Sequence, residues 1–112
     1  RYDVLSAHPM LGHGRGRLSP QKVTMAMALE GQNRRYHWDG IRLRHWLEMG
    51  KRCGVPDMTT LVREIIDVTP AALAVARQAI PAGFPAAIAD RILDGVQAAA
   101  QRLGGEMAAM PR

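Results

Sequence analysis

The sequence predicts a mainly α-helical fold in which about four helices accompany one short β-hairpin. Hydrophobic residues make up 47% of the 112 residues, yet the aromatic ones are only two Trp, two Tyr and one Phe. The apolar content therefore comes chiefly from Ala, Leu, Ile, Val and Met, which favour helices that pack through small and aliphatic side chains. From residue 39 onward, these residues recur at helical spacing. A chain of this length forms one domain, or a piece of one, with a modest core.

The β-hairpin is expected near residues 24–38, where the local signals conflict. A Ser-Pro pair before this stretch and a Gly within it are a typical start and stop of a helix. Side-chain size also alternates along its first half, however, and a Gly-Gln-Asn turn leads into a second run in which Arg34, Tyr36 and Trp38 share a face. We therefore expect two short strands.

The first helix is expected between Asp39, which is a suitable N-cap, and Gly54, which ends the segment. One face of this helix is apolar and is expected to be buried; it consists of Leu43, Trp46, Leu47 and Gly50. The other side and the approach to the helix are basic and carry Arg42, Arg44, Lys51 and Arg52. These four residues form either a solvated face or a contact surface for an anionic partner.

Three more helices complete the expected fold. Asp57 is expected to cap one, and Thr69 with Pro70 to start the next. Prolines at both ends of residues 81–85 separate that helix from the last, which is expected over residues 85–103. Their apolar stripes are assigned to the core: Leu61, Val62, Ile65, Ile66, Leu73, Ala76, Ile80, Ile88, Ile92, Leu93, Val96, Ala99 and Leu103.

Two consequences follow from this assignment. If Ile65 and Ile92 are fully buried, replacing either with Ala is expected to cost roughly 2–5 kcal/mol of folding free energy. Residues 104–112 begin with two glycines, which are expected to end the last helix, so this tail is expected to fray.

Positive charge is concentrated in the first half of the chain. Residues 1–52 hold ten Lys or Arg against four Asp or Glu, a net charge of +6, whereas residues 53–112 have a net charge of −1. This asymmetry suggests that the first half meets an anionic partner. Cys53 is the only cysteine, and no apolar run approaches the roughly 20 residues of a membrane span. We expect a cytoplasmic protein without a membrane segment.

Asp3 is the first candidate for a chemical role because it is a lone carboxylate between Tyr2 and the apolar pair Val4 and Leu5. A charged group in such a setting needs a hydrogen-bond donor, a counter-ion or a metal. In one interpretation Asp3 caps a turn or a helix through backbone N–H groups. In the other it is a hard oxygen ligand for Mg²⁺ and faces the phosphates of a nucleotide.

Several short motifs decide between these interpretations by resemblance. They are Tyr2-Asp3-Val4-Leu5-Ser6-Ala7, then Pro9 and Leu11-Gly12, then Lys22 with Met25-Ala26-Met27-Ala28-Leu29, and finally Arg44-His45-Trp46. In this order they resemble the C-terminal part of HipA-type toxin kinases. The resemblance runs through Pro70-Ala71-Ala72 and Phe84-Pro85 to about Leu103 and fades in the tail. It implies a HipA-like C-terminal domain over residues 1–103, incomplete at its N-terminal side, which forms part of a kinase C-lobe.

The resemblance also implies a role for Asp3. In this family the Asp of the Tyr-Asp-Val motif corresponds to the metal-binding Asp that follows the catalytic loop of protein kinases, so Asp3 would hold Mg²⁺ against the phosphates of ATP. The nucleotide-covering loop, the phosphate-binding Lys and the catalytic-loop Asp and Asn have no counterpart in this chain. We therefore expect an N-terminal kinase region to supply them and expect this chain alone to be inactive.

A second function class remains open beside the serine/threonine kinase of a toxin–antitoxin system. HipA-type kinases are typically bound by a small helix-turn-helix antitoxin, which would give the basic first half an acidic or DNA-associated neighbour. In this alternative the chain is a non-catalytic interaction module that contacts an antitoxin or DNA phosphates, and Asp3 is structural. No base-reading pattern is present, so phosphate contact is the most that the alternative predicts.

Overall fold

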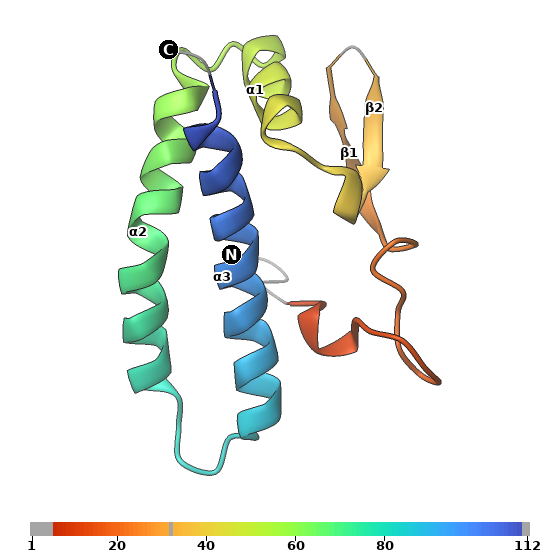
Figure 1. Cartoon of the computed structure of the whole chain (residues 1–112), viewed down its shortest axis with the longest axis vertical. Helices are drawn as coiled ribbons and strands as arrows, with labels where there is room; N and C mark the ends of the chain where they lie inside the picture. Colours follow the sequence, from red (N-terminus) through yellow and green to blue (C-terminus); the bar gives the residue numbers. More distant parts are fainter. Residues whose placement is uncertain (1–5, 32, 111–112) are drawn as a thin grey trace.

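The structure is a computed structural model and describes residues 6–31 and 33–110. Figure 1 shows two long antiparallel helices side by side, with a shorter helix and a β-hairpin alongside one end of the pair. The elements in chain order are η1 (His8–Met10), β1 (Thr24–Glu30), β2 (Arg34–His37), η2 (Trp38–Gly40), α1 (Leu43–Arg52), α2 (Met58–Ala79) and α3 (Ala86–Ala108). The expectation of a mainly helical fold is confirmed.

The hairpin of β1 and β2 confirms the choice of strands over a helix. The strands are antiparallel, and Glu30 pairs with Arg34 beside the turn. The register shifts between Thr24 and Leu29, so the ladder is irregular in its middle. Trp38 does not continue the strand as expected, because it begins the 3-10 turn η2.

α1 begins later than the sequence indicates. Asp39 was expected as its N-cap, but Asp39 lies inside η2, where the N–H of Ile41 donates to the carbonyl of Trp38 at 3.3 Å. The backbone then runs extended through Ile41 and Arg42, so the N-cap position falls to Arg42. The other end agrees with expectation, since Gly54 follows the helix with a φ of +74°.

α2 is one helix where two were expected. Asp57 caps it as predicted, since its Oδ1 accepts from the N–H of Thr60 at 3.1 Å. Thr69 and Pro70 do not start a new helix, because Pro70 lies inside α2. A proline at this position removes the hydrogen bond that residue 70 would donate to the carbonyl of Ile66, but the residues after Pro70 are mostly strong helix formers.

α3 is longer than expected and runs through two glycines to Ala108. The expectation that residues 104–112 fray is wrong for residues 104–108, which are helical. Gly104 faces α2, where an added Cβ would lie 3.4 Å from Ile66, so the missing side chain allows close helix packing. Residues 111–112 lie outside the described residues.

The core is small and lies mainly where α1, the hairpin and the long helices meet. The buried apolar residues of the described chain are Leu29, Ile41, Leu43, Val62, Ala89 and Leu93. Some residues assigned to the core are instead on the surface: Leu61, Ile65, Ile88 and Val96 are 42%, 55%, 41% and 40% exposed. The core assignment of Ile65 was therefore wrong, and Ile92 is only half-buried.

The exposed apolar residues of α2 form a continuous stripe. Leu61, Ile65, Val68 and Val75 recur at intervals of four, three and seven residues, so they lie on one face of the helix. Their exposed fractions range from 42% to 66%. None of the helices in residues 6–31 and 33–110 is long and apolar enough to cross a membrane.

Candidate functional site

Asp3, the candidate Mg²⁺ ligand, lies outside the described residues. The described chain starts with Ser6, and the segment that follows is held on α3. The His8 ring lies against Gly95, where an added Cβ would overlap the imidazole. Further along, the guanidinium of Arg91 donates to the carbonyl of Leu11 at 2.9 Å. Among the described residues, no group of three His, Cys, Asp or Glu side chains is placed to hold a metal ion.

The four candidate anion-binding residues of α1 do not act as one group. Arg42 forms an ion pair with Glu106 of α3 at 3.2 Å. Arg52 donates to the carbonyl of Gly31 at 3.2 Å. Arg44 and Lys51 are exposed and one heptad apart, so these two share a face of the helix.

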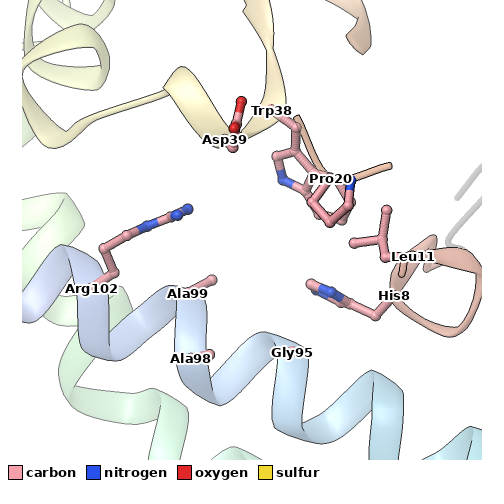
Figure 2. A pocket seen from close by; sticks show the side chains of 9 residues that line it. All are labelled: His8, Leu11, Pro20, Trp38, Asp39, Gly95, Ala98, Ala99 and Arg102. Atoms are coloured by element: carbon pink, nitrogen blue, oxygen red, sulfur yellow. The ribbon is translucent and has the colours of Figure 1, made fainter. Parts of the chain in front are cut away.

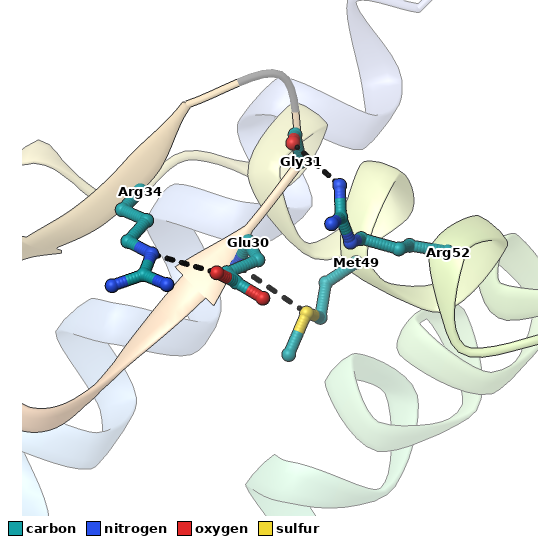
Figure 3. A network of polar contacts seen from close by, with 5 residues as sticks. All are labelled: Glu30, Gly31, Arg34, Met49 and Arg52. Carbon is teal, nitrogen blue, oxygen red and sulfur yellow. Dashed lines mark hydrogen bonds and ion pairs between the residues drawn. The ribbon is translucent and has the colours of Figure 1, made fainter.

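Figure 3 shows that the contact of Arg52 belongs to a polar network between the hairpin and α1. The carboxylate of Glu30 pairs with Arg34 at 2.7 Å across the hairpin turn. The N–H of Glu30 donates to the sulfur of Met49 at 3.3 Å. Arg52 therefore helps to hold the hairpin against α1, which is a structural role that its place in a basic sequence does not reveal.

The N-terminus of α1 is capped by two side chains to which sequence analysis gave no capping role. The Nδ1 atom of buried His45 accepts from the N–H of Arg42 at 2.9 Å. The Glu106 carboxylate accepts from the N–H of Leu43 at 2.7 Å, 63 residues away in the chain. Both contacts satisfy N–H groups that a helix start leaves without intrahelical partners, and a carboxylate there also interacts favourably with the helix dipole.

The environment of this cap lowers the pKa values of His45 and Glu106. Burial lowers the pKa of His45, and the nearby cations of Arg35 and Arg44 lower it further, against the carboxylates of Glu48 and Glu106. His45 is therefore neutral at pH 7. Burial alone would raise the pKa of Glu106, but the hydrogen bonds from Leu43 and Arg42, together with the positive charges of Arg42 and Arg102, hold this pKa below its ordinary value. The Nε2 atom of His45 is buried without a hydrogen-bond partner in the described chain.

A hollow of about 350 Å³ lies between η1, η2 and α3 and has both a carboxylate and a guanidinium in its lining. Figure 2 shows Arg102 extending from α3 toward Asp39, while His8, Leu11, Pro20 and Trp38 lie on the opposite side. The floor consists of small residues of α3: Gly95, Ala98 and Ala99. Other hollows lie around the capped end of α1 and under the hairpin, and the latter is almost entirely apolar in its lining.

The aromatic wall of this hollow is formed by His8 and Trp38, whose ring centroids are 5.0 Å apart at an interplanar angle of 41°. Burial lowers the pKa of His8, so its imidazole is neutral at pH 7. Asp39 and Arg102 are exposed and form no ion pair with each other. No motif in the sequence brings these four residues together, because they come from three separate elements.

Comparison with known proteins adds no family to this description. No protein-family model matches the chain, and no curated protein matches it significantly. The assignment of function therefore depends on the motifs and on the geometry described above.

Proposed function

We propose that this chain is the helical C-terminal portion of a HipA-like serine/threonine protein kinase of a toxin–antitoxin system. The observation that carries the proposal is the ordered set of motifs from Tyr2 to Trp46. In the proposal, Asp3 holds Mg²⁺ against the phosphates of ATP, and a kinase region upstream of this chain supplies the catalytic loop and the remaining nucleotide contacts.

The anchoring of residues 8–11, which follow Asp3 in the sequence, supports this role. His8 packs on Gly95, and Arg91 donates a hydrogen bond to the carbonyl of Leu11, so two independent contacts hold residues 8–11 on α3. A carboxylate that positions a metal must be attached to a rigid support, because phosphoryl transfer depends mainly on positioning and on neutralising charge.

The exposed stripe of α2 supports the existence of a further folded region. Leu61, Ile65, Val68 and Val75 form an apolar face that nothing in the described chain covers. Contiguous apolar surfaces of this kind usually mark a contact with another part of a protein or with a partner. In the proposal, the upstream kinase region packs against this stripe and completes the C-lobe.

The proposal is tested by phosphate transfer from labelled ATP in the presence of Mg²⁺, with an extended protein that includes the proposed upstream kinase region. The extended protein is expected to transfer phosphate, whereas residues 1–112 alone are expected to be inactive. Asp3→Asn is expected to reduce transfer by two orders of magnitude or more, since it removes a metal-bound carboxylate. Asp67→Asn, an exposed carboxylate of α2, is the matched control and is expected to leave transfer unchanged. Equal transfer by the parent and Asp3→Asn would show that Asp3 is a structural cap.

A second candidate function, an interaction module for an acidic antitoxin or DNA phosphates, is favoured by the position of Arg35. This exposed residue of β2 and Arg44 of α1 both lie close enough to His45 to lower its pKa, so two elements place cations in one region. The candidate contact surface therefore consists of Arg35, Arg44 and Lys51, since Arg42 and Arg52 are engaged within the fold.

This candidate is tested by the salt dependence of binding to duplex DNA. Neutralising Arg35, Arg44 and Lys51 together is expected to weaken binding and to reduce the slope of log K against log salt by about 2–3. Neutralising Arg42 and Arg52 is expected to affect folding stability more than binding. If neither set changes the salt slope, the basic first half is a solvated surface.

A further inference from the structure

We propose that the hollow between η1, η2 and α3 binds a free aromatic α-amino acid. Its carboxylate would be held by Arg102, its ammonium group by Asp39, and its ring by the wall that includes Trp38. The proposal depends neither on Asp3 nor on the proposed kinase function.

The charges of the lining favour a zwitterion. Asp39 and Arg102 are the only two charged side chains that line the hollow in the described chain. They come from different elements and form no ion pair with each other, although Arg102 extends toward Asp39 (Figure 2). One guanidinium and one carboxylate match a ligand with one charge of each sign. A nucleotide carries several negative charges, for which the hollow offers only the Arg102 guanidinium, and the Asp39 carboxylate would repel them.

The apolar part of the hollow favours an aromatic side chain. Leu11, Pro20 and the Trp38 ring form one wall, and His8 lies beside Trp38 as a second ring. Aromatic rings prefer tilted or offset neighbours at centroid distances of about 4.5–7 Å, and a ligand ring placed here would find such neighbours. The neutral imidazole adds no charge that would disturb the balance between Asp39 and Arg102.

The size of the hollow favours a single amino acid. Ligand pockets typically range from about 300 to 1,000 Å³, so a volume of about 350 Å³ lies near the lower limit. Ala98 and Ala99 keep the floor low, because larger residues at these positions of α3 would reduce the space, whereas the space beside Gly95 is occupied by the His8 ring. A peptide terminus would present only one of the two charges next to its side chain, whereas a free amino acid presents both.

The experiment is a titration of the protein with L-phenylalanine at millimolar concentrations, followed by calorimetry and by the indole N–H signals in an NMR spectrum. We expect saturable binding that shifts the signal of Trp38. Trp46 lines a different hollow and serves as the internal control. L-phenylalaninamide and N-acetyl-L-phenylalanine each lack one charge and are expected to bind about tenfold more weakly or worse.

Two substitutions connect the binding to the proposed contacts. Arg102→Gln and Asp39→Asn alter exposed side chains and are expected to weaken L-phenylalanine binding about tenfold each. Asp67→Asn on α2 is expected to leave it unchanged. The absence of saturable binding to the parent protein, undiminished binding to Arg102→Gln, or tighter binding of AMP than of L-phenylalanine would overturn the proposal. Loss of phosphate transfer in Asp3→Asn has no bearing on any of these results.

Discussion

The region around α1 and the outer face of α2 differ in how far the rest of the fold covers them. α1 has three buried residues, Leu43, His45 and Gly50, and Glu106 connects its N-terminus to α3. The outer face of α2 instead carries an apolar stripe that the described chain leaves exposed. The comparison shows that helical periodicity identifies an apolar face in both regions, whereas contacts between distant segments decide which face is covered.

The largest expected effect is the difference in unfolding free energy lost when Leu43 or Ile65 is replaced with Ala. Leu43 is 3% exposed, so Leu43→Ala is expected to cost roughly 2–5 kcal/mol of unfolding free energy. Ile65 is 55% exposed, so Ile65→Ala is expected to cost less than about 1 kcal/mol in residues 1–112. Urea denaturation of both variants measures the difference. Equal losses would contradict the comparison.

The same two substitutions also test the proposal that an upstream region covers the apolar stripe of α2. In the extended protein, Ile65→Ala is expected to become more costly, approaching the effect of Leu43→Ala, because the added region covers the stripe. Asp67→Asn is expected to have little effect on either length of the protein. An Ile65→Ala effect that does not change with chain length would indicate that the stripe meets something else.

The cap of α1 gives an intermediate effect. Glu106→Ala removes the acceptor of the Leu43 N–H and the partner of Arg42, and is expected to cost about 1–2 kcal/mol. Glu64→Ala, on exposed α2, is the matched control and is expected to stay within about 0.5 kcal/mol. Thermal unfolding of both variants provides the measurement. If the two variants unfold alike, the contact of Glu106 with α1 contributes nothing to stability.

The pKa shifts predict two separate windows of acid destabilisation. The pKa values of His45 and His8 are below their ordinary 6.5 in the fold, so the unfolded chain binds more protons once the pH drops below 6.5. Stability is therefore complete above pH 6.5 and decreases as the pH falls toward the folded pKa values. The lowered pKa of Glu106 adds a second decrease, which begins below its ordinary 4.5.

Substitutions at the cap of α1 show which side chain causes the loss of stability in each pH window. His45→Asn retains an acceptor for the N–H of Arg42 and is expected to reduce the loss of stability between pH 6.5 and pH 4.5. Glu106→Gln is expected to reduce only the loss below pH 4.5. The measurement is the unfolding free energy of each variant across this pH range. A parent protein with constant stability from pH 7 to pH 5 would contradict the predicted loss of stability below pH 6.5.

The smallest effect is expected from the ion pairs between α2 and α3. Arg77 meets Asp94 at 3.0 Å and Asp90 at 3.6 Å, but all three side chains are substantially exposed. Arg77→Gln is therefore expected to cost less than about 1 kcal/mol, and the cost is expected to decrease in high salt. A larger, salt-independent loss would show that the helical hairpin depends on these pairs.

Local signals predicted much of the secondary structure. Asp57 as a cap, Gly54 as a stop, the break at residues 81–85 and the hairpin all depend on neighbours in the sequence. The wrong predictions concern positions where distant contacts outweigh local preference. A proline did not end α2, and Gly104 did not end α3, because packing between the two helices favours their continuation.

The sites were less predictable than the fold. The cap of α1 depends on Glu106, which sequence analysis placed in a fraying tail, and the hollow depends on His8, Trp38, Asp39 and Arg102 from separate elements. Asp39 was noticed only as a helix cap. The basic sequence around α1 allowed either a solvated face or an anionic contact at Arg42 and Arg52, whereas in the structure both residues form contacts within the fold.

The most direct test of the central claim is the thermal stability of the upstream-extended protein with ATP, measured with and without Mg²⁺. If Asp3 holds the metal, Mg-ATP is expected to raise the Tm of the parent protein and of Asp67→Asn, with little shift for ATP without Mg²⁺. The shift is expected to disappear in Asp3→Asn. An equal Mg-dependent shift in Asp3→Asn and in the parent would contradict the assignment of Asp3 to the Mg-ATP site.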